Sequence, residues 1–187
     1  MQELNVAPPI PLQPSSLRDR GLAWLVDAII RAPLSLLAFV IAIGSKNLVL
    51  VVIILVAREA YKPVMEGMYG HTIGKKVLKI KVVNQQDGAP ITWNQSLMRF
   101  IPWAIALYTE IFVTVRLFQL PGFADVRDLE TYTEFQSNSP LAGNFLVGLL
   151  GVAWIFSCMW IFSDPLRRAM HDWFGRTLVV EDKEVGI

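Results

Sequence analysis

One long apolar stretch near the N-terminus, residues 18–43, constrains the fold more than any other feature of this sequence. It is long enough to cross a bilayer as a helix, since a hydrocarbon core about 30 Å thick requires about 20 mostly apolar residues. Asp27 and Arg31 nevertheless lie inside it. A charge at such a depth costs at least ~2.5 kcal/mol, so it is retained only where it meets a partner or water. Arg20, Asp27 and Arg31 share one helix face, which must therefore face protein or an aqueous cavity.

Further apolar runs of similar length follow along the chain. Apolar residues make up 53% of the 187 residues, and they are grouped in blocks, which is typical of a membrane protein. The second run is the most polar, because Arg58, Glu59 and Lys62 lie in its second half. We therefore predict an all-α transmembrane fold, a four-helix membrane bundle. Its spans are expected at about 22–43, 48–65, 97–118 and 141–162.

The basic residues that flank these predicted spans indicate an orientation. Arg18 and Arg20 precede the first span, four lysines follow the second, and Arg167 and Arg168 follow the fourth. The loop at 119–140 is acidic instead. Because basic residues concentrate on the cytoplasmic side, we predict that both termini and the loop 66–96 are cytoplasmic and that 119–140 is external.

The two ends of the chain differ from the membrane domain predicted between them, residues 18–181. The N-terminal segment has no signal-peptide pattern. Its proline content predicts a disordered cytoplasmic tail over residues 1–17, and residues 182–187 are expected to form a short C-terminal tail.

Two β-prone segments lie on the predicted cytoplasmic side. Apolar and basic residues alternate over 78–83, the period of a half-buried strand. A turn follows at 85–88, with a short return at 89–92, and TLVVE at 177–181 is a second candidate strand. We predict a small cytoplasmic β element that joins the middle loop to the C-terminal segment.

Three motifs, taken together, resemble the RDD family of bacterial membrane proteins. They are RDRGLAWLVDAII at 18–30, GHTIGKKVLKIKVVNQQDGAP at 70–90 and RRAMHDWFGRTLVV at 167–180. Arg20, Asp27 and Asp172 match the arginine and the two aspartates that name the family, whereas Asn84 stands where an aspartate is common. The resemblance implies a multi-pass protein of the bacterial cytoplasmic (inner) membrane. It also implies transport for some members, such as cation/proton exchange.

The charged residues of the spans are expected at similar depths. At 1.5 Å per residue, Asp27 and Arg31 lie about 8 and 14 Å inside the cytoplasmic boundary. The spacing predicts one charged cluster, with Asp27 and Arg31 favourably placed to pair within their helix. Two interpretations stay open: a structural ion-pair network, or a polar cavity where Asp27 binds a cation or proton, with Glu110 farther along a possible ion path. The predicted cluster comprises Arg20, Asp27, Arg31, Arg58, Glu59, Arg99 and Asp172.

Several function classes are disfavoured. The net charge of +1 gives no global field for binding nucleic acid. The single cysteine, Cys158, excludes an intrachain disulfide and a thiolate metal cluster. Residues 70–76 lack the spacing and the Ser/Thr of a phosphate-binding loop. We find no catalytic set in the sequence and predict a non-enzyme without cofactor or metal.

Two functions remain. The first is a transporter-like protein that moves a small cation or proton, as a homo-oligomer or with a partner, because four short spans seldom enclose a pathway. The second is a non-catalytic subunit or adaptor of a membrane complex. A basic run at the inner surface is expected to contact anionic lipid headgroups of the bilayer or a partner. The run comprises Lys75, Lys76, Lys79 and Lys81.

Overall fold

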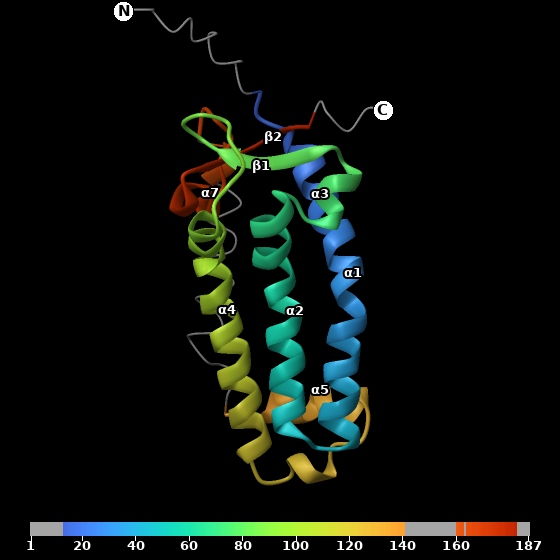
Figure 1. Cartoon of the computed structure of the whole chain (residues 1–187). Helices are drawn as coiled ribbons and strands as arrows, with labels where there is room; N and C mark the ends of the chain where they lie inside the picture. Colours follow the sequence, from blue (N-terminus) through green and yellow to red (C-terminus); the bar gives the residue numbers. More distant parts are fainter. Residues whose placement is uncertain (1–12, 141–159, 163, 183–187) are drawn as a thin grey trace, which may run out of the picture.

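Three long helices stand side by side, and a small sheet caps one end of them (Figure 1). Helix α2 lies between α1 and α4 and packs against both. The helices are α1 (Leu17–Gly44), α2 (Leu48–Tyr69) and α4 (Trp93–Gln119). The computed structural model describes residues 13–140, 160–162 and 164–182.

Each long helix begins at a polar N-cap, which satisfies a backbone donor that the helix itself leaves free. Asp19 N donates to Ser16 Oγ at 3.1 Å at the start of α1, and Leu50 N donates to Asn47 Oδ1 at 3.0 Å at the start of α2. Thr92 and Gln95 form a capping box at the start of α4. The local sequence therefore sets where the long helices start.

The first three predicted spans lie within α1, α2 and α4, so the prediction of a mostly helical fold is confirmed for these regions. Among the described residues, α1 and α4 are long and apolar enough to cross a membrane, whereas α2 carries Arg58, Glu59 and Lys62 in its second half. The fourth predicted span lies outside the described residues except for 160–162. The four-helix bundle stays a prediction for that reason.

The cap is a two-stranded antiparallel sheet. Strand β1 (Ile80–Asn84) pairs with β2 (Thr177–Glu181), with Ile80 opposite Glu181 and Asn84 opposite Thr177. The return after the turn reaches the sheet through a bridge between Pro90 and Val83. The predicted β element that joins the middle loop to the C-terminal segment is confirmed.

Residues 14–17, which the sequence assigned to a disordered tail over residues 1–17, are ordered in the structure. Residues 1–12 lie outside the described part, but Pro14 bridges to Val180, and Ser15 N donates to Val179 O at 2.9 Å. Ser15 is fully buried. The sequence prediction rested on proline content, yet a proline at a sheet edge disrupts no central ladder. Pro14 and Ser15 are therefore part of the cap.

Short helices occupy the segments that the sequence predicted only as loops or tails. Helix α3 (Ile73–Val77) follows α2, and α7 (Met170–Gly175) precedes β2. The acidic segment contains the 3-10 helix η1 (Phe123–Asp125) and α5 (Leu129–Asn138), and α5 crosses the opposite end of the bundle from the sheet (Figure 1). Lys46 Nζ donates to Phe123 O at 3.0 Å, which ties this segment to the turn between α1 and α2.

The buried apolar core is divided between the cap and the helices. Ala23 of α1 packs with the cap residues Ile80, Val82, Ile91 and Val179. A second cluster joins α1 to α2 through small side chains such as Ala38 and Ala42. Many large apolar side chains of the long helices remain exposed, among them Ile29, Leu36, Val49, Ile53 and Ile105. An exterior with this many exposed apolar side chains is typical of a lipid-facing or partner-facing surface.

Gly74 lies where α3 contacts α1, and a substitution there would show how closely these two helices pack. An added Cβ would lie 2.1 Å from Ala23 O and 2.8 Å from Asp27 Oδ1. We expect Gly74→Ala to reduce stability by about 1–3 kcal/mol, because backbone atoms must shift. Thermal unfolding in detergent measures the effect.

Gly21→Ala is the matched control, because a Cβ at Gly21 meets nothing within 4 Å. It should leave the protein as stable or raise stability by about 0.5–1 kcal/mol, since alanine favours the helix. Equal melting temperatures for Gly74→Ala and the control would contradict the packing described here.

Candidate functional site

A buried arginine joins the helices to the cap. The side chain of Arg99 is only 1% exposed, and its Nε donates to Glu66 Oε2 at 2.9 Å. Its Nη1 pairs with Asp172 and donates to Thr177 Oγ1. Because Glu66 lies in α2, Asp172 in α7 and Thr177 in β2, one guanidinium of α4 links three other elements.

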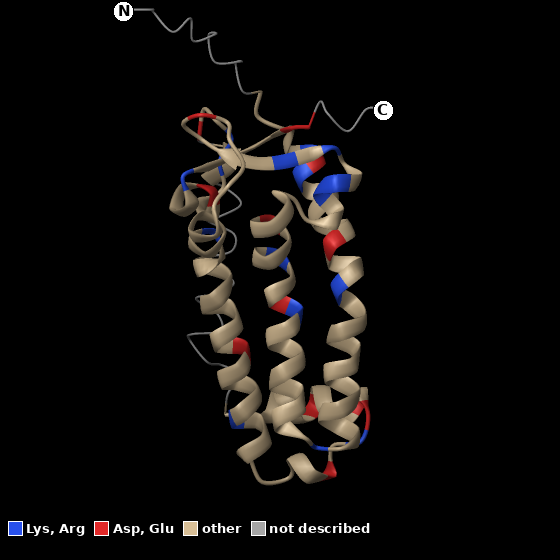
Figure 2. Cartoon of the chain, in the orientation of Figure 1, with Lys and Arg blue, Asp and Glu red and all other residues tan. Residues whose placement is uncertain are grey.

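Both carboxylates that bind Arg99 also bind a second cation. Arg20 Nη1 donates to Asp172 Oδ2 at 3.0 Å, and Lys75 Nζ pairs with Glu66. We call these five residues, Arg20, Glu66, Lys75, Arg99 and Asp172, the cap cluster. Figure 2 shows charged residues concentrated at the sheet end of the helices. Removing any one of these partners would leave a buried charge uncompensated.

Two neighbouring residues of α7 have shifted pKa values. Burial alone would raise the pKa of Asp172, but the adjacent Arg99, His171 and Arg20 and a backbone N–H bond from Ala169 hold it well below its usual range. Burial lowers the pKa of His171 well below its usual range, and the nearby Lys62 and Arg99 act in the same direction. His171 Nε2 lies 3.4 Å from Asp172 Oδ1, yet burial and these cations outweigh that carboxylate. His171 is therefore neutral near pH 7.

Asp27 is bound by neutral donors. It accepts hydrogen bonds from Tyr61 Oη at 3.0 Å, Thr72 Oγ1 at 2.6 Å and Gly74 N at 2.8 Å. Among the described residues it forms no ion pair, so the pairing with Arg31 that the sequence favoured is absent. The reason is that Arg31 turns to α2 instead, where its Nη1 lies 3.1 Å from Glu59 Oε1. Three donors are enough to stabilise a buried carboxylate.

A separate chain of charges crosses the helices nearer their middle. Glu59 lies between Arg31 of α1 and Arg58, whose Nε donates to Glu59 Oε1 at 2.9 Å. Arg58 Nη2 in turn pairs with Glu110 of α4. We call Arg31, Arg58, Glu59 and Glu110 the mid-helix chain. It links the three long helices at one level.

The structure divides the single cluster predicted from the sequence into three sites. Arg20, Arg99 and Asp172 belong to the cap cluster, Arg31, Arg58 and Glu59 to the mid-helix chain, and Asp27 to its own set of donors. Arg99 lies in the second turn of α4, close to the sheet, whereas Glu110 is the α4 residue that reaches the level of Arg58.

The predicted basic run is likewise divided. Lys76 and Lys79 are exposed, in keeping with a contact surface. Lys75 points inward to Glu66 and its side chain is 12% exposed, while Lys81 Nζ lies 2.9 Å from Asp182 Oδ1. Only part of the run is thus available at the surface, because α3 turns one lysine toward the helices.

Sequence reasoning missed several residues of these sites. Glu66 of the cap cluster and the Asp27 donors Tyr61 and Thr72 were not predicted. A signal for Glu66 was present, since Glu59, Lys62 and Glu66 recur at spacings of three and four along α2 and so share a face. The donors to Asp27 carried no such pattern, because they depend on how α3 folds back.

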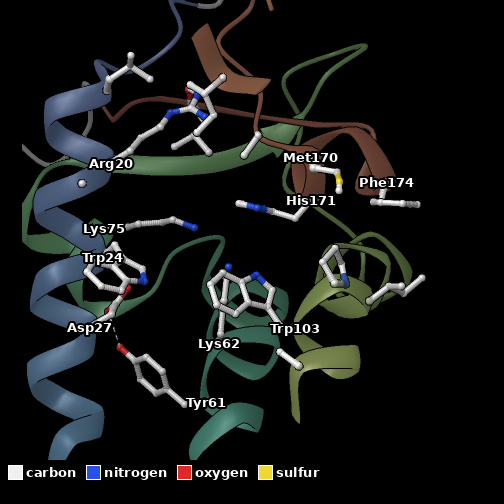
Figure 3. A pocket seen from close by; sticks show the side chains of 18 of the residues that line it. Arg20, Trp24, Asp27, Tyr61, Lys62, Lys75, Trp103, Met170, His171 and Phe174 are labelled. Atoms are coloured by element: carbon white, nitrogen blue, oxygen red, sulfur yellow. Dashed lines mark hydrogen bonds between the residues drawn. The ribbon is translucent and has the colours of Figure 1, made fainter. Parts of the chain in front are cut away.

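A cavity of about 780 Å³ lies beside the cap cluster and the Asp27 site. Lys62, Lys75 and His171 extend toward it from three elements (Figure 3). Among the described residues, no group of three or more histidine, cysteine, aspartate or glutamate side chains is placed to hold a metal ion. The absence of a cofactor and of catalysis stays a prediction.

His171 predicts a pH dependence of stability. Its pKa in the folded protein lies below the unfolded value of about 6.5, so below that pH the unfolded state binds more protons and stability falls. We expect the melting temperature to decrease as pH falls from about 7.5 to 5.5, and His171→Gln to remove much of that decrease. Thermal unfolding of both proteins across this range measures it; parallel curves would contradict a neutral, half-buried His171.

Comparison with known proteins identifies the family of this chain. The sequence model of the RDD family matches residues 14–176, a range that contains α1, α2, α4, α7 and the cap cluster. No curated protein and no solved structure matches the chain. The family is membrane-associated, and the apolar helices α1 and α4 also indicate a membrane protein. With nearly the whole described chain inside the match, the protein belongs to the RDD family.

Proposed function

We propose that the protein is a multi-pass protein of the bacterial inner membrane, with both termini and the segment 66–96 in the cytoplasm. Helices α1, α2 and α4 are three of its spans, and residues 141–162 supply the fourth. The apolar exterior of the helices and the basic residues at the sheet end support this orientation.

We further propose that it serves as a non-catalytic subunit or adaptor of a membrane complex. One observation carries this proposal: the carboxylates deep in the long helices are already bound by donors from other elements. Asp27 has three neutral donors, Glu66 has two cations, and Glu59 and Glu110 are held by arginines. Such contacts fix helices in register and leave these carboxylates little capacity to take up a passing ion.

Cation movement along these residues is disfavoured by the arginines. Arg31 and Arg58 both contact Glu59, and a guanidinium stays protonated at any physiological pH. A cation that approached Glu59 would meet two fixed positive charges. Releasing Glu59 from its partners would also leave charges unpaired, at a cost of about 3–5 kcal/mol.

The surface of α3 supports partner binding. Lys76 and Lys79 are exposed at the sheet end, and Val77, which lies between them in the sequence, is 63% exposed. Ile73 on the same short helix is also exposed. A basic surface with apolar side chains at its centre fits an acidic protein segment that also offers apolar groups.

A transporter remains the second candidate, and two cavities favour it. The larger cavity reaches Asp27 and Arg31 from the sheet side, and a smaller one of about 180 Å³ reaches Arg58 and Glu110 from the other side. Glu59 lies between them, bound to both arginines. If these ion pairs opened, the two cavities would define the ends of a path.

Ion flux separates the two functions. We expect purified wild-type protein in liposomes to give no gradient-driven flux of Na⁺, K⁺ or H⁺ above empty vesicles. Asp27→Asn should instead lose about 1–3 kcal/mol of stability, because an amide nitrogen in place of Oδ2 cannot accept the hydrogen bond from Thr72 Oγ1. Asp87→Asn, at an exposed turn, is the control. Wild-type flux that Asp27→Asn abolishes and Asp87→Asn retains would overturn the adaptor proposal.

The adaptor proposal makes its own prediction for the surface of α3. Reversing two charges, Lys76→Glu with Lys79→Glu, should repel an acidic partner. We expect quantitative mass spectrometry of cross-linked membranes to find a partner that co-purifies with wild type and falls at least about tenfold with this variant. Arg127→Glu, exposed at the opposite end, should retain it. Identical co-purification by all three proteins would argue against this docking surface.

A further inference from the structure

The cavity beside the cap cluster combines a cationic end with apolar walls. We propose that it binds an acidic phospholipid, with the phosphate at Lys62 and the acyl chains along α4. This site is distinct from the exposed lysines of α3, and it does not depend on whether the protein is an adaptor or a transporter. Its volume of about 780 Å³ lies within the usual range of ligand cavities, about 300–1,000 Å³. That is room for a headgroup and the first part of the chains.

Among the described residues, Lys62 is the cation lining this cavity that has no ion pair with a carboxylate. Arg20, Arg31 and Lys75, which also line it, pair with Asp172, Glu59 and Glu66 respectively. Within the described residues Lys62 forms no ion pair. Its Nζ lies 4.3 Å from the centre of the Trp103 ring, a contact that stabilises an ammonium without neutralising it. An anion at Lys62 would complete the pairing.

The surroundings of Lys62 add to the positive charge. Glu66 and Asp172 are shared among three cations, Arg20, Lys75 and Arg99, so the cap cluster carries one positive charge more than it has carboxylates. Asp27 offsets one charge but is committed to its own donors. With Lys62 included, this end of the cavity keeps a positive excess. A phosphate diester fits it better than a zwitterionic headgroup, whose ammonium would be repelled.

The remaining wall distinguishes a lipid from a free anion. Ile101 and Ile105 are one turn apart on α4 and both remain exposed, Ile105 by 54%. Trp24 of α1 and Phe174 of α7 add exposed aromatic surface to the lining. Inorganic phosphate would leave this apolar surface uncovered. Acyl chains cover it and gain about 0.8 kcal/mol for each buried CH₂ group.

Lipid retention tests the proposal. Full-length protein is reconstituted with equal amounts of phosphatidylglycerol and phosphatidylcholine, extracted in mild detergent, and its bound lipid is counted by native mass spectrometry. Wild type should retain phosphatidylglycerol in preference to phosphatidylcholine. Lys62→Met should lower that retention about fivefold, the loss expected for one basic contact. Lys62→Arg and the exposed control Arg127→Met, at the opposite end of the helices, should retain it.

A second variant keeps the test decisive if Lys62→Met fails to fold. Ile105→Trp fills the apolar wall and leaves every charge in place, so it should also reduce phosphatidylglycerol retention while the melting temperature of the lipid-free protein is unchanged. Equal retention by wild type, Lys62→Met and Ile105→Trp would overturn the proposal. So would equal retention of the two lipids by wild type. Inorganic phosphate that displaces the bound lipid at millimolar concentration would overturn it in favour of a free anion.

Discussion

The buried guanidinium of Arg99 is the interaction on which the arrangement of this chain depends. An arginine cannot neutralise itself by losing a proton, so burying it requires carboxylates at fixed positions. Glu66 and Asp172 supply them from α2 and α7. The guanidinium of Arg99 therefore fixes both how closely α4 packs against α2 and where α7 lies. Gly175 allows the close contact, since a Cβ there would lie 2.5 Å from Arg99 Cγ.

The three residues that were matched to the family motif from the sequence contribute to this same arrangement. Arg20 reaches the shared carboxylate Asp172 and also donates to Val179 O at 3.2 Å, so it ties α1 to α7 and to β2. Asp27 ties α1 to the segment around α3 through Thr72 and Gly74. Arg20, Asp27 and Asp172 thus attach the first helix to the cap. Residues from three motifs far apart in sequence thus meet where α1 contacts the cap.

The sequence predicted elements better than contacts, for physical reasons. Hydrophobic length found α1, α2 and α4, and residue alternation found β1. The partners of the charged residues were predicted less well. Spacing along a helix gives the depth of a residue, but it does not give the direction in which its side chain points. Arg31 and Asp27 share a face of α1, yet one turns to Glu59 and the other to Thr72. Nothing local to α1 distinguishes them; the partners come from how α2 and α3 pack.

How each buried charge is compensated also separates structural from functional residues. Glu59 and Glu66 are matched by cations, and Asp27 by three neutral donors, so each is stable without any added group. Lys62 differs, because it forms no ion pair among the described residues, and an aromatic ring and a cavity lie beside it. A membrane offers phosphate headgroups at the depth where α2 ends, and no folding step is needed to recruit one. Lys62 is therefore the residue at which a bound anion would complete the pairing of charges. Asp27, the residue that the sequence alone would single out, already accepts three hydrogen bonds.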